Sequence, residues 1–434
     1  MSHDTAVPPG ADGNPLRLTA ALSAWALVVG IAAGAGASAF VALQHHLTHW
    51  LWHVLPGLLG HAEAPWWMVL SLPVIGGLLV FATFQLPGHG GHSPLAGFGL
   101  GIGPREVGSV LLAALASLVF GAVLGPEAPL MAVGTAIGAL AFRKNQPVAR
   151  QVTMIVGAMA AMGALFGNPL ITTILLLEVA LAAGATLATP VILLPSLVGL
   201  ASGYLLQVGV ADWSGLGATQ MALPGLAAYA NVRLVDLVIA VPLAIVVAAV
   251  AIAARLGALR VDQMARRAPL ATLAGAGGIT GLCALAVLLF AGQSPDLVLF
   301  SGQTAMPAYL GLTSLGTAAT VLIAKFVAYT VCLGSGFRGG VIFPAIALGT
   351  IMAVMTSPLT GAVPNTALIA AAIAAATAAS MRFPFTAVLL GVLLTISAGP
   401  AATVPAIIGA VVGMLFRLAA ERRVPSLAPG AGPS

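Results

Sequence analysis

Glu127 is an acidic residue in an apolar stretch, and its type and position indicate chemistry more clearly than any other residue. It lies between Pro126 and Pro129 in LGPEAPLMAVGT, residues 124–135. Placing an ionised carboxylate at membrane depth costs roughly 2.5 kcal/mol or more, so such a residue indicates a function. At the start of a helix a carboxylate can take the place of an anion, because the free N–H groups there attract negative charge. A fixed cap on that helix is the alternative interpretation.

A second segment repeats this pattern later in the chain. GPEAPLMAVGT (125–135) and GVIFPAIALGT (340–350) share Gly, Pro, Gly and Thr at the same spacing, and the step from Pro169 to Pro384 equals the step from Gly125 to Gly340. We call this common step the repeat displacement. Proline suits the first turn of a helix, where its missing N–H has no partner, and glycine lets the backbone turn. The spacing therefore predicts broken helices that begin inside the membrane and whose N-termini point at one central anion site.

The elements that must position these motifs are membrane helices. The chain has 434 residues, of which 60% are hydrophobic and 6% charged, and its mean hydropathy is +1.08. So few charges cannot cover the surface of a soluble protein of this length. Several apolar stretches reach the roughly 20 residues that span a bilayer. They include 18–43, 66–84, 234–254 and 270–289. We predict an all-α polytopic membrane protein.

The repeat displacement predicts two homologous membrane repeats, joined by a linker. The predicted segments are a flexible lead (1–16), the first repeat (17–210), the linker (211–231), the second repeat (232–420) and a short tail without a soluble domain (421–434).

Loop charge predicts how the two repeats are oriented. The segment with Arg143, Lys144 and Arg150 and the segment 255–267 are basic, whereas the counterpart of each, one repeat displacement away, has no Lys or Arg. Basic loops stay on the cytoplasmic side, so matching loops with opposite charge bias lie on opposite sides. The repeats are therefore predicted to be inverted, an architecture in which half-helix ends meet near the midplane.

These motifs resemble those of the CLC family of chloride channels and proton-coupled chloride transporters, over about residues 17–420. The segment 125–129 is similar to the family's Gly-Arg-Glu-Gly-Pro motif, whose glutamate is the external gate. The segment 340–344 is similar to its Gly-x-Phe-x-Pro motif, whose backbone amides bind chloride, and 166–179 to the following helix with its acidic end. The resemblance implies a CLC-type inverted repeat of tilted and broken helices with a central anion site.

The resemblance also implies roles for particular residues. Glu127 would gate the pathway, occupying an anion position when deprotonated and leaving it when protonated. The expected anion contacts are Gly125, Pro126, Ala128, Gly340, Val341, Ile342 and Phe343, together with Gly91 and Ser93 in GHGGHSP (88–94). A homodimer with one pathway per subunit is implied, and the apolar stretches 169–183, 190–207 and 401–416 are candidates for the subunit contact.

Two anion-binding motifs depart from the family pattern. Pro126 and Ala128 replace Arg and Gly beside the gate. The coordinating serine of the family's first anion motif falls on Gly91, so Ser93 or a histidine is the candidate substitute. The family's chloride-coordinating tyrosine has no counterpart in RRVPSLAPG; the tyrosines are residues 204, 229, 309 and 329.

The residues expected for a proton pathway also depart from the family pattern. Val179 occupies the position of the inner proton acceptor of coupled members, and Glu178 is the adjacent acid. This favours a Glu127-gated chloride (anion) pathway that is channel-like or weakly proton-coupled. Three alternatives stay open: a strict chloride/proton antiporter using Glu178, a non-conducting membrane scaffold, and a transporter of another anion such as fluoride.

The remaining expectations concern partners and other chemistry. Chloride is the expected substrate and no cofactor is expected; the partners would be small anions, protons in the exchanger alternative, the lipids of the plasma (inner) membrane and a second copy of the chain. Neither an enzyme nor a nucleic-acid partner is indicated.

A few other residues could do chemistry. His45, His49 and His53 are spaced to share a helix face that could bind zinc or copper, but an interfacial helix end is favoured and no metal site is predicted. Lys325 and Arg382 are cations that either attract anions or snorkel to the interface.

Overall fold

The computed structural model describes residues 15–97, 103–142, 146–182, 189–214, 222–361 and 364–427. Arg143 and Lys144 lie outside these residues, as do most of the predicted lead, half of the predicted tail and part of the predicted linker. The described part of the chain is helical, and nine of its helices are long and apolar enough to cross a membrane. The predicted all-α polytopic membrane fold is confirmed, while the predicted segment boundaries stay a prediction.

The helices fall into two series of eight within the described ranges. The first series is α1 (Pro15–His49), α2 (Leu55–Leu58), α3 (Trp66–Thr83), α4 (Val107–Leu118), α5 (Glu127–Ala141), α6 (Pro147–Phe166), α7 (Pro169–Ala182) and α8 (Pro190–Ser214). The second series is α9 (Leu234–Arg267), α10 (Pro269–Ala291), α11 (Met306–Leu310), α12 (Leu315–Ser335), α13 (Ile342–Thr356), α14 (Thr366–Met381), α15 (Pro384–Leu394) and α16 (Thr403–Arg423).

The two series repeat at the displacement read from the sequence. Helices α5 and α13 have the same length, and both ends of α13 lie one repeat displacement after those of α5. Helices α7 and α15 begin at Pro169 and Pro384, as predicted, and the same displacement separates the last residues of α6 and α14. Each proline fits the first turn, where no N–H bond is lost.

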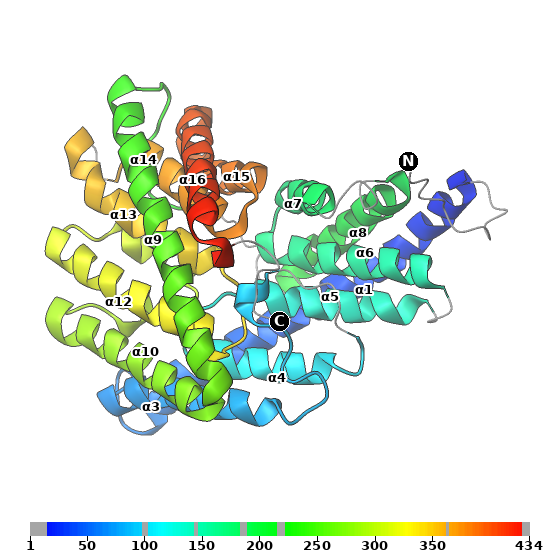
Figure 1. Ribbon diagram of the computed structural model, residues 1–434, viewed down its shortest axis with the longest axis horizontal. Coiled ribbons are helices and arrows are strands. Elements are labelled where there is room, and N and C mark those ends of the chain that lie inside the picture. The colour runs from blue at the N-terminus through cyan, green and yellow to red at the C-terminus, as the bar shows by residue number, and fades with distance from the viewer. Residues whose placement is uncertain are drawn as a thin grey trace.

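Packing repeats as well. Helix α5 packs on α6 as α13 packs on α14, and α1 packs on α8 as α9 packs on α16. The two sets lie side by side in Figure 1, with α1, α5, α6 and α8 on one side and α9, α13, α14 and α16 on the other. Helix α3 of the first series packs against α10 of the second and so joins them. The central helices α6 and α14 are buried around most of their circumference, which explains why they are apolar on every face.

One local prediction is wrong. The basic segment 255–267 is not a loop but the last turns of α9. Its Ala, Leu, Arg, Gln and Met residues are strong helix formers, and an Asp262–Arg266 ion pair of 3.0 Å spans one turn. The stretch with the three histidines continues from α1 into a five-residue π-helix, Trp50–Val54.

Candidate functional site

The repeated glycines Gly125 and Gly340 bond to each other at the centre of the molecule. The N–H of Gly125 donates to the carbonyl of Gly340 at 2.9 Å, and the N–H of Gly340 donates to the carbonyl of Gly125 at 2.6 Å. This antiparallel bridge joins equivalent residues of the two series, as a local two-fold axis between inverted repeats requires. Helices α5 and α13 begin two residues after the bridge, at Glu127 and Ile342, so the N-termini of two half-helices meet there.

Glu127 places its carboxylate at the N-terminus of the other half-helix. The side chain is fully buried, and Oε1 accepts the N–H of Phe343 at 3.2 Å. The backbone N–H groups of Glu127 itself and of Ile342 also act on the carboxylate. Oε2 has no hydrogen-bond partner among the described residues. The first residue of α5 therefore puts a negative charge on the positive end of α13, where one of its oxygens is unpartnered.

The glycines of the bridge leave the space that this carboxylate fills. A Cβ added to either Gly125 or Gly340 would collide with the carboxylate of Glu127. The same space, edged by N–H groups of α13, suits a small anion when the carboxylate is elsewhere.

The predicted backbone contacts are not equivalent. Phe343 and Ile342 point N–H groups at the carboxylate, whereas Val341 is the residue that precedes α13. Pro126 is the corresponding residue before α5 and has no N–H to donate. Ala128, the second residue of α5, is half-buried.

The predicted first anion motif folds into a tight turn that leaves little room for the missing hydroxyl. Gly91 has φ +83°, and an added Cβ would lie 2.9 Å from a methyl carbon of Val110. A serine at this position would be strained by the backbone angle and crowded by Val110. The Ser93 hydroxyl accepts the N–H of Leu95 at 3.3 Å and so begins the short 3₁₀ helix η2 (Pro94–Ala96). Neither Gly91 nor Ser93 bonds to Glu127 in the described structure.

Glu178 is a buried carboxylate whose acceptors are well occupied. Oε1 accepts the N–H of Phe385 at 2.8 Å, and Oε2 accepts the N–H and hydroxyl of Thr386 at 2.8 and 2.6 Å. All three donors belong to the first turn of α15, so Glu178 on α7 caps the equivalent helix of the other series. The neighbouring Val179 is half-buried and packs against the core.

The two cations expected near membrane depth have different partners. Lys325 is fully buried rather than snorkelling, and its ammonium donates to the carbonyls of Val298 and Phe300 at 3.0 and 3.4 Å. Arg382 pairs with Glu421 at 3.2 Å. Both side chains therefore hold structure together, and neither contacts the Glu127 carboxylate.

The histidines make no metal centre in the described part of the chain. The rings of His49 and His53 are 5.3 Å apart, but no group of three His, Cys, Asp or Glu side chains is spaced for a metal ion among the described residues.

Tyr329 is a buried tyrosine on α12. It is 3% exposed, and the charges that act on its hydroxyl are those of Arg255 and Glu127. It lies on the helix that leads into the second glycine motif, not at the C-terminal position of the family's tyrosine.

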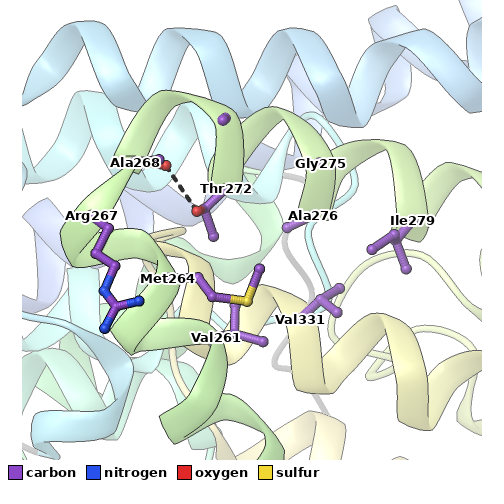
Figure 2. A pocket seen from close by; sticks show the side chains of 10 residues that line it. Val261, Met264, Arg267, Ala268, Thr272, Gly275, Ala276, Ile279 and Val331 are labelled. Carbon is purple, nitrogen blue, oxygen red and sulfur yellow. Dashed lines mark hydrogen bonds between the residues drawn. The ribbon is translucent and has the colours of Figure 1, made fainter.

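A surface groove of about 380 Å³ lies apart from this site, between α9, α10 and α12. Figure 2 shows its mainly apolar lining, with Met264, Ile279 and Val331 among the side chains and Arg267 at one end. The dashed bond joins the Thr272 hydroxyl to the carbonyl of Ala268 at 2.8 Å, so this hydroxyl is already bonded within α10. None of the lining residues belongs to the predicted site.

Comparisons with known proteins agree with this architecture. YfeO of Salmonella paratyphi A, named as a putative ion-transport protein, is 29% identical over 362 residues, which cover 80% of this chain and 83% of that protein. A slow cyanobacterial Cl⁻/H⁺ antiporter superposes with a TM-score of 0.74 at 21% identity, covering 92% of this chain and 94% of that one. A CLC-type fluoride/proton antiporter superposes with a TM-score of 0.70 at 19% identity, covering 93% and 96%.

Family membership follows from the sequence match. The profile described as "Voltage gated chloride channel" matches residues 85–418, which is more than half of the chain. The chain therefore belongs to the voltage-gated chloride channel family, the CLC family predicted from its motifs.

Proposed function

We propose that the protein carries chloride or another small anion across the plasma (inner) membrane through a site that Glu127 opens and closes. The observation that carries this proposal is the position of the Glu127 carboxylate on the N-terminus of α13. A carboxylate and a chloride ion compete there for the same N–H groups. Transport, rather than catalysis of a covalent reaction, is the role expected of such a site.

Protonation provides a way to release the carboxylate. A neutral carboxyl group loses the attraction of the helix dipole and accepts a weaker hydrogen bond from Phe343. The unpartnered Oε2 means that few bonds hold the closed position. Acidic pH would therefore free the site and raise anion flux.

Channel-like or weakly coupled transport is the first candidate mode. A coupled exchanger needs a proton acceptor on the inner side, and this chain has Val179 at the position that the family resemblance gives to it. The adjacent Glu178 accepts three hydrogen bonds from α15, an arrangement that resists movement of its carboxylate.

Strict anion/proton exchange is the second candidate mode. Both solved structures compared above are antiporters, one named for chloride and the other for fluoride. In this mode Glu127 would carry the proton as well as close the path, and the exchanged anion would be chloride or fluoride.

Flux from proteoliposomes with simultaneous recording of pH tests the proposal. Wild-type chloride flux is expected to rise on acidification, by up to about tenfold per pH unit where the gate is mostly deprotonated. Glu127→Gln mimics the protonated gate, so its flux should be high and independent of pH. Glu106→Gln is the matched control, because Glu106 is an exposed carboxylate outside the helices.

The other outcomes separate the candidates. Uphill proton movement driven by a chloride gradient would show that the protein is an exchanger and would contradict the channel-like mode. If neither wild type nor Glu127→Gln carries any anion in a panel that includes fluoride and nitrate, the non-conducting scaffold is the remaining candidate.

We also propose that the protein forms a homodimer with one pathway per subunit. Large apolar side chains are exposed along α7, α8 and α16, among them Leu181, Leu205 and Leu415. Light scattering of the detergent-solubilised protein should give twice the 43.1 kDa mass of the chain. A single-chain mass at every concentration and in several detergents would contradict the dimer.

A further inference from the structure

We propose that Arg255 and Tyr329 form the inner anion-binding position of the pathway, in place of the serine and tyrosine that the chain lacks. This inference rests on the proposed anion transport and names the residues that take the anion between Glu127 and the basic end of α9. Three observations support it: both side chains have hydrogen-bond donors without a protein partner, their helices α9 and α12 pack together, and the charge around Arg255 is positive.

Tyr329 has an unused hydroxyl on a buried side chain. The side chain is 3% exposed, and no hydrogen bond to its hydroxyl exists within the described part of the protein. Tyr309 on α11 is the opposite case, because it is fully buried and its hydroxyl donates to the carbonyl of Leu297 at 2.8 Å. A phenol O–H that makes no bond within the protein is available to donate to a bound anion.

Arg255 also has unused donors. Nη2 donates to the carbonyl of Leu95 at 3.2 Å, whereas Nε is buried without a partner. Among the described residues, no carboxylate lies within ion-pair distance of this guanidinium. Its charge is therefore available to an anion.

The packing of α9 on α12 brings the two side chains to the same place. A Cβ on Gly257 would lie 2.6 Å from the methyl carbon of Thr330, so the two helices are in close contact beside Arg255 and Tyr329. The charges of Arg255 and Glu127 both act on the Tyr329 hydroxyl. Helix η2, which carries Leu95 and follows the serine-free turn, packs on both α9 and α12. Arg255 bonds to Leu95 of this short helix, so the segment that follows the serine-free turn lies against Arg255.

The charge around Arg255 favours an anion as well. The charged neighbours that act on it are Arg382, Arg417 and Glu421, so the group of four carries a formal charge of +2. Glu421 already pairs with both Arg382 and Arg417, at 3.2 and 2.6 Å. Arg255 is therefore the arginine of this group without a carboxylate partner, and its positive charge favours a bound anion.

Equilibrium chloride binding to the full-length, detergent-solubilised chain tests the site. Calorimetry should show about tenfold weaker binding for Tyr329→Phe and for Arg255→Gln, since each removes a hydrogen bond to a charged ligand. Arg255→Lys keeps the charge and should weaken binding less. The matched controls are Tyr309→Phe, which removes a bonded hydroxyl, and Arg260→Gln, which removes an exposed charge from the same helix.

Stability separates a binding role from a structural one. Tyr329→Phe removes a hydroxyl without a partner, so its melting temperature should not fall, whereas Tyr309→Phe should melt lower and bind chloride like wild type. Chloride affinity within twofold of wild type for both Tyr329→Phe and Arg255→Gln would overturn the site. So would a loss confined to Arg255→Gln, or a wild type that binds no chloride.

Flux measured on the same variants distinguishes this inference from the proposed function. A wild type that binds chloride at these residues but carries no anion would overturn transport and leave the site standing. A wild type that transports, with variants that keep both affinity and flux, would overturn the site alone.

Discussion

Glu127 and Glu178 are both buried carboxylates at the N-terminus of a helix from the other half, yet their hydrogen bonding differs. Glu178 accepts three bonds of 2.6–2.8 Å, and Glu127 accepts the Phe343 N–H at 3.2 Å with one oxygen unpartnered. Short, saturated bonds to a carboxylate fix it, whereas a weakly held carboxylate can leave at modest cost. The geometry therefore suits Glu178 to a structural role and Glu127 to a moving one.

Removing the Glu178 carboxylate should destabilise the protein. We expect Glu178→Ala to lower the free energy of unfolding by about 2–3 kcal/mol, because α15 loses its cap and the Thr386 hydroxyl loses its acceptor. Denaturant titration in detergent measures this loss. Glu106→Ala, which removes an exposed carboxylate, should change stability by less than about 0.5 kcal/mol. Wild-type stability together with lost proton coupling in Glu178→Ala would instead make Glu178 part of the proton pathway.

At the residue scale the sequence predicts where a functional residue lies in a helix better than it predicts the groups to which a side chain bonds. The position of Glu127 at a helix start follows from Pro126 and Pro129 alone, because proline and glycine determine where the helix begins. The burial of Lys325 does not follow, since its acceptors are carbonyls of Val298 and Phe300 in a distant loop. Carbonyl groups are present at every residue, so no sequence pattern marks them as partners.

At the element scale the site depends on a backbone contact between two half-helices. Gly125 and Gly340 pair because inverted repeats bring equivalent residues to one axis. The carboxylate of Glu127 then lies against both glycines, which leaves no room for a side chain at either.

A methyl group at Gly340 should push the gate out. Gly340→Ala is expected to displace the Glu127 carboxylate and so give a flux that is higher than wild type at neutral pH and less dependent on pH. Flux between pH 7 and pH 5 in proteoliposomes measures this. Gly275→Ala on α10 is the matched control, because an added Cβ there meets nothing within 4 Å. Wild-type pH dependence in folded Gly340→Ala would show that the carboxylate does not need this space.

The sequence predicted where helices begin, but it did not predict how far α9 extends. The repeated prolines at 169 and 384 mark the first residues of α7 and α15. The extension of α9 through 255–267 was missed because charge was taken as the sign of a loop, although charged residues such as Arg are good helix formers. The same extension places Arg255 on α9.

At the scale of the whole molecule the inverted repeat predicts which ends of the helices share a membrane face. The guanidinium of Arg233, just before α9, donates to the carbonyl of Thr360, just after α13, at 2.8 Å. The end of α13 therefore lies beside the start of α9. The other end of α9 is about 50 Å away, since its 34 residues rise 1.5 Å each. Arg260, Arg266 and Arg267 make that far end basic, so it belongs on the cytoplasmic face.

Labelling of single cysteines from one side of the membrane tests this orientation. In a Cys283→Ala background that keeps the buried Cys332, Leu359→Cys should react with a membrane-impermeant maleimide added to intact cells, because Leu359 is 71% exposed beyond α13. Arg266→Cys, on a side chain 58% exposed at the other end of α9, should react only after the membrane is opened. The background protein without an added cysteine is the control and should stay unlabelled. Labelling of both positions from the outside would contradict this orientation, since Arg233 fixes residue 360 to the start of α9 and a helix of 34 residues separates that start from Arg266.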